Sequence, residues 1–206
     1  MNNFLDLVFL PAALAGLTVF IATPWVIKLA WKIGLIDDPK KNKHPKVIHT
    51  YPTPRGGGLA IFAGIFLSCL FFLPIDKHLT GILAGAFFLV VLGLLDDKYN
   101  LHPIKRLAIQ FLVAGIPIAA GIGIAFLTNP FNGILDLSHP QITFKLFGDE
   151  KSIWLFSDLF ALFWIVTLMN FINIGASGLD GQLTGTTVIA AATIALIRGP
   201  YKTGAL

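Results

Sequence analysis

The hydrophobic and polar positions of the chain divide it into long apolar runs separated by short polar segments. The runs without a charged residue are Leu7–Ile27, Gly56–Ile75, Leu79–Leu95, Leu107–Leu135, Leu159–Leu179 and Gly181–Ile197. A helix that crosses a bilayer needs about 20 mostly apolar residues. The pattern therefore predicts an all-α polytopic membrane protein with about six transmembrane helices, the first from about Leu5 to Trp31 and the fourth from about Ile104 to Leu127.

The polar segments between the runs are short and predict little further regular structure. Residues Gln141–Phe147 alternate polar and apolar positions and are followed by Gly148, which predicts a strand of a short external β-hairpin. The loop Gly34–Gly58 is rich in Pro, Lys and Gly, so we do not expect regular structure throughout it. We interpret residues 1–206 as a single integral-membrane domain with no soluble domain.

Composition and charge agree with a membrane protein and orient it. Hydrophobic residues make up 55% of the chain and charged residues 13%, which excludes an ordinary soluble domain. Ten of the 15 Lys and Arg residues lie at the ends of the first and third runs or in the loops that follow them. The positive-inside rule then predicts a multi-pass protein of the cytoplasmic (inner) membrane, with these loops inside and the N-terminus outside. The basic residues are not interleaved with exposed aromatics, so nucleic acid is not an expected partner.

Asp96 and Asp97 close the third apolar run and are the most informative polar residues of the chain. A carboxylate at the bilayer centre costs about 2.5–3.5 kcal/mol, and negative charge is unfavourable at the C-terminal end of a helix. A pair kept against both penalties indicates a nearby cation, most simply Mg²⁺, which prefers carboxylate oxygen. Two other interpretations remain: an ordinary polar end to a span, and a cation relay of a transporter.

Two further polar segments fall on the same predicted membrane face. Within Pro54–Gly58, Arg55 could bind phosphate through two hydrogen bonds, and the glycines would allow close approach to the backbone. The alternative is a flexible, basic entry to the second span. Asn170, Asn173 and Asp180 follow the fifth run, where polar groups buried without partners are costly. Here the alternative is helix capping and a turn.

Three stretches of this sequence, taken together, resemble the polyprenyl-phosphate N-acetylhexosamine-1-phosphate transferase family, in its bacterial GlcNAc-1-phosphate branch. They are Gly34–Pro39 with His49–Gly58, Gly93–Pro103 continuing to Arg106 and Gln110, and Asn170–Asn173 with Gly178–Gly181. Members transfer a sugar phosphate from a UDP-sugar to a membrane lipid phosphate. The resemblance implies transfer of N-acetylhexosamine-1-phosphate to undecaprenyl phosphate, with release of UMP, for cell-envelope polysaccharide synthesis.

The resemblance also implies roles for individual residues. Asp96 and Asp97 would be catalytic, with Asp96 orienting the lipid phosphate. Asp97 and Asp180 would contribute to a site for Mg²⁺, with Mn²⁺ as the alternative metal. The implied substrate-binding residues are His49, Arg55, Gly57, Arg106, Asn170 and Asn173. Ser177 stands where the family has an Asp, which would weaken a contact to metal or uridine.

The resemblance covers the whole chain but only about the first two thirds of a family member. The later Gly-Asp-x-Gly-Ser motif and a His-rich loop have no counterpart before Leu206. We therefore expect the N-terminal part of a larger transferase domain, incomplete by itself. The expected partners are the membrane, a polyprenyl phosphate and a UDP-sugar, and a homodimer is left open. A non-catalytic truncated homologue is the alternative function, besides the transporter.

Overall fold

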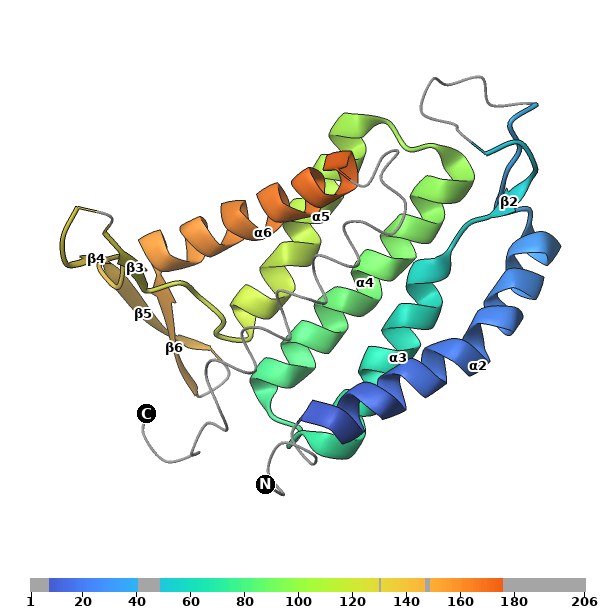
Figure 1. The fold of residues 1–206 in the computed structure, drawn as a ribbon. Coiled ribbons are helices and arrows are strands. Elements are labelled where there is room, and N and C mark those ends of the chain that lie inside the picture. The colour runs from blue at the N-terminus through green and yellow to red at the C-terminus, as the bar shows by residue number, and fades with distance from the viewer. Residues whose placement is uncertain (1–7, 41–48, 130, 147–148, 176–206) are drawn as a thin grey trace. The chain divides into compact units, whose positions relative to one another are not determined.

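The computed structural model describes residues 8–40, 49–129, 131–146 and 149–175 and is mostly helical (Figure 1). The chain forms two compact units, which are described separately. Unit 1 comprises Met1–Pro74, Gly93–Asn100 and Phe171–Leu206, and unit 2 comprises Ile75–Leu92 and Leu101–Asn170. One long helix, α4, thus begins in unit 2 and ends in unit 1.

Unit 1 is built on two helices that pack closely against each other. Its elements are α2 (Leu10–Ile33), β1 (Ile36–Asp37), β2 (Thr53–Pro54) and α3 (Gly57–Phe72), followed by the end of α4. Figure 1 shows α2 and α3 side by side. A Cβ added to Gly64 of α3 would lie 2.6 Å from the Val19 side chain of α2, so only glycine permits this approach. The Ser68 hydroxyl donates to the carbonyl oxygen of Pro11 over 2.9 Å and closes the same contact.

The connection between α2 and α3 begins with a left-handed glycine and then forms a small sheet. Gly34, with φ of 74°, ends α2 and donates its N–H to the carbonyl of Ala30. Strands β1 and β2 pair antiparallel, with Ile36 opposite Pro54. These two-residue strands are the regular structure in the described part of this loop. This agrees with the prediction that the loop is not regular throughout.

Unit 2 holds most of the remaining elements. They are the beginning of α4 (Lys77–Tyr99), α5 (Pro103–Ala119), β3 (Phe126–Thr128), β4 (Ile134–Asp136), β5 (Gln141–Leu146), β6 (Asp149–Trp154) and most of α6 (Leu155–Gly175). Helices α4 and α5 meet at Gly81, where an added Cβ would lie 2.3 Å from the Cβ of Ala120. Helices α5 and α6 meet through the rings of Phe111 and Phe163, whose centroids are 5.4 Å apart.

The β-hairpins of unit 2 confirm one prediction and correct another. The predicted strand at 141–147 is present as β5, which pairs antiparallel with β6. The fourth helix was expected to continue to about Leu127, and this expectation is wrong, because α5 ends at Ala119. Pro117 lies in the last turn of α5, and Gly121 follows with φ of 97°, a conformation that a helix cannot continue through. The apolar residues beyond it form the hairpin β3–β4.

Three of the described helices are long and apolar enough to cross a membrane: Leu10–Ile33, Lys77–Tyr99 and Leu155–Asn173. Helix α3 is apolar but has only 16 residues. Large apolar side chains are exposed along these helices, Phe20 to 78%, as expected for surfaces that face lipid. The prediction of about six spans is not confirmed, and the sixth, at Gly181–Ile197, lies outside the described residues.

Candidate functional site

Arg55 lies between strand β2 and helix α3, and backbone contacts fix its position in unit 1. Its N–H donates to the carbonyl of Leu35 over 2.9 Å, which extends the β1–β2 pairing by one step. Gly56 follows with φ of 95°, and an added Cβ there would lie 3.1 Å from the side chain of Leu94. This glycine is therefore required by the turn that starts α3.

The Arg55 guanidinium lies between two carboxylates, one from strand β1 and one from near the end of helix α4. Its Nη2 donates to Oδ2 of Asp37, and its Nη1 lies 3.6 Å from Oδ1 of Asp97. The Asp37 side chain is 12% exposed, against 31% for Arg55 and 35% for Asp97. Nε2 of His49 lies 3.3 Å from the Asp37 carbonyl oxygen and 3.9 Å from Oδ2 of the same residue. These four residues are called the Arg55 cluster below.

The Arg55 cluster borders an open cavity of 380 Å³ within unit 1. The cavity is lined by Asp37, Arg55 and Asp97 together with Gly34, Ile36, Asp38, Lys98 and Asn100. This volume falls in the lower part of the range of about 300–1,000 Å³ that small-molecule sites occupy. The walls carry both signs of charge, as a site for an anion with a counter-cation requires.

Gly57 and Gly58, at the start of α3, are not explained by packing. A Cβ added to either residue would meet no atom within 4 Å, and neither has a positive φ. Helix α3 also has no side-chain cap and no acidic residue in its first turn. The unpaired N–H groups of a helix N-terminus attract anions. The beginning of α3 is thus accessible to an anionic ligand.

The described residues contain no group of three or more His, Cys, Asp or Glu side chains that could hold a metal ion. A dedicated protein cage is therefore not formed by this part of the chain. Mg²⁺, however, commonly takes one or two carboxylates and completes its shell with water and substrate phosphate. Asp97 could supply one such carboxylate from its position near the end of α4. Asp180 lies outside the described residues.

Asn170 takes part in a polar pair inside unit 2. Its side-chain amide donates to Oε1 of Gln110 on α5 and to the carbonyl of Val166, each over 2.8 Å. The two N–H donors of this amide are therefore used, and Gln110 is only 6% exposed. The contact holds α5 to α6 and leaves the substrate-binding prediction for Asn170 untested.

Three further predicted residues, Asp96, Arg106 and Asn173, lie near helix ends. Asp96 precedes Asp97 near the end of α4, and its carbonyl accepts the N–H of Asn100 over 2.8 Å. Arg106 lies in the first turn of α5, and Asn173 lies in the last turns of α6. The structure brings together Asp97, Arg55 and His49 from the predicted set. The roles assigned to the other residues stay predictions.

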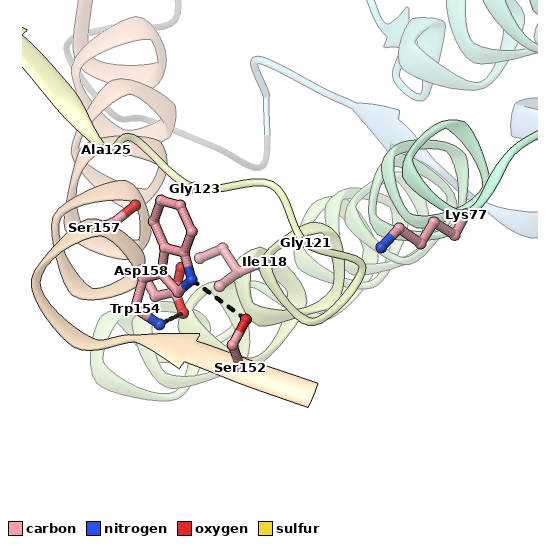
Figure 2. A pocket seen from close by; sticks show the side chains of 9 residues that line it. All are labelled: Lys77, Ile118, Gly121, Gly123, Ala125, Ser152, Trp154, Ser157 and Asp158. Atoms are coloured by element: carbon pink, nitrogen blue, oxygen red, sulfur yellow. Dashed lines mark hydrogen bonds between the residues drawn. The ribbon is translucent and has the colours of Figure 1, made fainter. Parts of the chain in front are cut away.

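A second cavity, of 260 Å³, lies in unit 2 beside the beginning of α6 (Figure 2). Asp158 lies in the first turn of α6 and accepts the backbone N–H of Trp154 over 3.0 Å. The Trp154 indole N–H in turn donates to the hydroxyl of Ser152 over 3.3 Å. Figure 2 shows both contacts at one end of the cavity, where the bond from Trp154 to Asp158 attaches the hairpin β5–β6 to the helix. Asp158 is thus an N-terminal helix charge with a structural partner.

Comparison with known families addresses what kind of protein carries this site. A family model described as "Glycosyl transferase family 4" matches residues 79–204, which is more than half of the chain. The chain belongs to glycosyl transferase family 4. The matched segment of this family 4 chain includes Asp96, Asp97 and Arg106, whereas Asp37 and Arg55 precede it.

Several relatives resemble this family 4 chain over most of its length. A Bacillus subtilis (strain 168) protein named "Probable undecaprenyl-phosphate N-acetylglucosaminyl 1-phosphate transferase" is 38% identical over 182 residues, which are 88% of this chain and 45% of that protein. A Mycolicibacterium smegmatis decaprenyl-phosphate N-acetylglucosaminephosphotransferase is 27% identical over 88% of this chain and 44% of its own length. A Lactobacillus gasseri phospho-N-acetylmuramoyl-pentapeptide-transferase is 35% identical over 70% of this chain and 45% of its own length.

The family 4 chain spans less than half the length of these relatives, so the expectation of about two thirds of a family member is wrong. No solved structure matches it. Its apolar helices, together with the similarity to transferases named for polyprenyl-phosphate substrates, identify a multi-pass membrane protein.

Asp37 is the member of the Arg55 cluster that the site prediction for this family 4 chain missed. A signal for it exists in the sequence, because Gly34–Asp38 reads Gly-Leu-Ile-Asp-Asp and Gly93–Asp97 reads Gly-Leu-Leu-Asp-Asp. At Gly34–Asp38 the helix ends before the acidic pair, and Asp37 lies in strand β1. At Gly93–Asp97 the helix continues through the acidic pair. This difference explains why the first Asp of one pair and the second Asp of the other reach the same guanidinium.

Proposed function

We propose that this protein contributes to transfer of N-acetylhexosamine-1-phosphate from a UDP-sugar to a polyprenyl phosphate, with release of UMP. The observation that carries the proposal is the Arg55 guanidinium, held between Asp37 and Asp97 at an open cavity. The names of the similar proteins support a sugar-phosphate transfer to a polyprenyl phosphate. The Lactobacillus gasseri relative is named for a different sugar. We propose UDP-N-acetylglucosamine as the substrate because the Bacillus subtilis relative, which has the higher sequence identity of the two, is named for N-acetylglucosamine.

Arg55 and the start of α3 would bind the diphosphate of the UDP-sugar. A guanidinium presents parallel N–H groups that match two phosphate oxygens. The open backbone at Gly57 would add N–H donors from the helix N-terminus. His49 would support this arrangement next to Asp37, and Arg106 would contribute a further positive charge toward phosphate.

Asp97 and Asp180 would hold Mg²⁺, with Mn²⁺ as the alternative. The bound metal would neutralise charge on the diphosphate. Asp97 fits this role because its carboxylate borders the cavity and is more exposed than that of Asp37. Asn173 would orient Asp180 or the nucleotide, and Asn170 would supply its side-chain oxygen.

The reaction itself requires positioning more than a strong base. An oxygen of the lipid phosphate forms a bond to the sugar-linked phosphorus, the bond from that phosphorus to the bridging oxygen breaks, and UMP leaves with that oxygen. Phosphate monoesters have a second pKa of about 6, so the attacking oxygen is already ionised near neutral pH. Asp96 would orient the lipid phosphate, and the basic groups would balance the charge that develops.

We further propose that the site faces the cytoplasm of a bacterial inner membrane, with the N-terminus outside. The concentration of basic residues in the loops after the first and third apolar runs supports this orientation. A transporter that relays cations through Asp96 and Asp97 is less well supported. Asp97 lies near the end of α4 and is paired with Arg55, whereas a relay would place the acidic groups inside a span.

A glycine variant tests whether the beginning of α3 is a ligand site. Gly57→Ala has room for its methyl group and should leave thermal unfolding unchanged or slightly raised. If phosphate approaches this backbone, the dissociation constant for UDP-N-acetylglucosamine in the presence of Mg²⁺ should rise about tenfold. Gly16→Ala in α2, where an added Cβ also meets no atom within 4 Å, is the matched control. Equal affinity of the two variants would contradict the proposed site.

A further inference from the structure

We propose that Asp37 is a positioning residue that holds the Arg55 guanidinium in the orientation needed to receive the diphosphate. This inference rests on the proposed function of the same site. It concerns a residue outside the segment that the family model matches, within the stretch Gly34–Pro39 but not among the site residues predicted from the sequence. The structural basis is a set of three constraints on the position of the arginine: backbone pairing, contact with a more buried carboxylate and contact with a more exposed carboxylate.

The backbone first brings the two residues together. Asp37 lies opposite Thr53 in the β1–β2 ladder, and the N–H of Arg55 donates to the carbonyl of Leu35. Both residues are therefore fixed on neighbouring strand ends before any side-chain contact forms. The side chain of Arg55 then needs only to turn toward Asp37 to complete the pairing.

The two carboxylates differ in a way that separates anchoring from ligand binding. Asp37 is 12% exposed and accepts a hydrogen bond from Nη2, whereas Asp97 is 35% exposed and lies 3.6 Å from Nη1. The contact to Asp37 is thus the shorter and more buried one. Because the two contacts use different nitrogens, the guanidinium plane is oriented as well as located.

An anchored arginine binds phosphate at a lower entropic cost than a free one. Arginine has several rotatable bonds, and immobilising them on ligand binding opposes association. Asp37 already immobilises these bonds in the folded protein, so ligand binding does not carry that entropic cost. We therefore expect removal of the Asp37 charge to weaken ligand binding through Arg55, without direct contact between Asp37 and the ligand.

The test uses the protein in lipid nanodiscs, with two readouts on Asp37→Asn and on the matched control Asp38→Asn. Asp38→Asn removes the same charge from the next residue of the same cavity wall, where Asp38 accepts the backbone N–H of Lys40, so it controls for the loss of a negative charge beside the ligand. The first readout is the side-chain Nε signal of Arg55 in NMR spectra of arginine-labelled protein. The arginines of the chain are Arg55, Arg106 and Arg198, so assignment is practicable. The second readout is the dissociation constant for UDP-N-acetylglucosamine with Mg²⁺.

We expect the Arg55 signal to show restricted rotation in the wild type and Asp38→Asn, and to lose this restriction in Asp37→Asn. Asp37→Asn should raise the dissociation constant about tenfold, and by several-fold more than Asp38→Asn does. In an Arg55→Gln background, Asp37→Asn should have no additional effect, because Asp37 would act only through Arg55. Asp37→Glu keeps the carboxylate and should restore part of the affinity.

Two results would overturn the proposal. One is an Arg55 signal that keeps its restricted rotation in Asp37→Asn. The other is a tenfold loss on Asp37→Asn that persists when Arg55 is already glutamine, which would assign Asp37 a direct role. Failure of the wild type to bind UDP-N-acetylglucosamine would instead contradict the proposed function, while the NMR readout would still decide whether Asp37 positions Arg55.

Discussion

Two polar pairs of this molecule, one beside the end of an apolar helix and one between two apolar helices, behave in opposite ways. In unit 1 the guanidinium of Arg55 and the carboxylate of Asp97 lie 3.6 Å apart and border an open cavity. In unit 2 the amides of Gln110 and Asn170 are joined by a hydrogen bond of 2.8 Å, and Gln110 is buried. The first pair is accessible to a ligand, and the second is closed by its own contacts.

The difference shows why a polar residue in an apolar helix does not by itself indicate chemistry. A buried amide whose donors are used stabilises the packing of two helices. A charged pair that lies beside a cavity, with its atoms separated by more than a hydrogen-bond distance, can still bind an external ligand. Arg55 and Asn170 were both expected to bind substrate; Arg55 lines a cavity, whereas the described contacts of Asn170 join α6 to α5 and leave its prediction untested.

The largest expected effect is that of Asp97→Asn. This substitution keeps the shape of the side chain and removes the charge that borders the cavity. In a full-length relative that carries the equivalent substitution, we expect Mg²⁺-dependent UMP release from UDP-N-acetylglucosamine to fall by at least about 100-fold, while the protein still inserts into membranes. The measurement compares UMP formation in membranes containing equal amounts of each variant. Near-normal Mg²⁺-dependent release from the variant would show that Asp97 is not a site residue.

A smaller effect, on stability, is expected in unit 2. Gln110→Leu removes one of the two acceptors of the Asn170 amide, leaving the Val166 carbonyl, and should lower the free energy of unfolding by about 1–2 kcal/mol. The double variant Gln110→Leu with Asn170→Leu should recover much of this loss, because no buried donor is left unpaired. Unfolding in mixed micelles measures both. Strictly additive losses would show that the two amides are not coupled.

The smallest effect is expected at Asp136, an exposed carboxylate with a satisfied local contact. Hydrogen bonds from the side chain and backbone of Ser138 lower the pKa of Asp136 below its ordinary value. Because the pKa is lower in the folded state, the contact stabilises the hairpin at pH values above the pKa of the unfolded state. This stabilisation is lost as the pH falls through the pKa of the folded state. An NMR titration of the carboxyl group should give a midpoint below about 3.9. A midpoint above that value would contradict the contact.

The helices were largely predictable from the sequence, and the ends of the helices were not. Apolar runs located α2 to α6, because burial in lipid requires them. The end of α5 at Ala119 was missed, since the apolar residues after it have the same hydropathy in a hairpin as in a helix. The conformation of Gly121, which prevents continuation of the helix, depends on backbone geometry that composition does not express.

The candidate site was predictable in its chemistry and only partly in its geometry. The sequence indicated Arg55 and Asp97 as phosphate and metal residues, and the structure places them together. Asp37 was missed because its role depends on strand pairing between segments that are distant in sequence. Asp37 falls in the loop that was predicted at Gly34–Gly58, and hydropathy does not indicate which residues of a loop pair as short strands.

The most direct test of this account measures UDP-N-acetylglucosamine affinity and thermal unfolding in one experiment on the wild type, Arg55→Gln and Gln110→Leu. We expect the wild type to bind in the presence of Mg²⁺. Arg55→Gln should lose at least about tenfold in affinity with a small change in unfolding temperature. Gln110→Leu should show the reverse, a lower unfolding temperature with nearly unchanged affinity. Equal affinity of the wild type and Arg55→Gln would contradict the central claim that the Arg55 cluster is the ligand site.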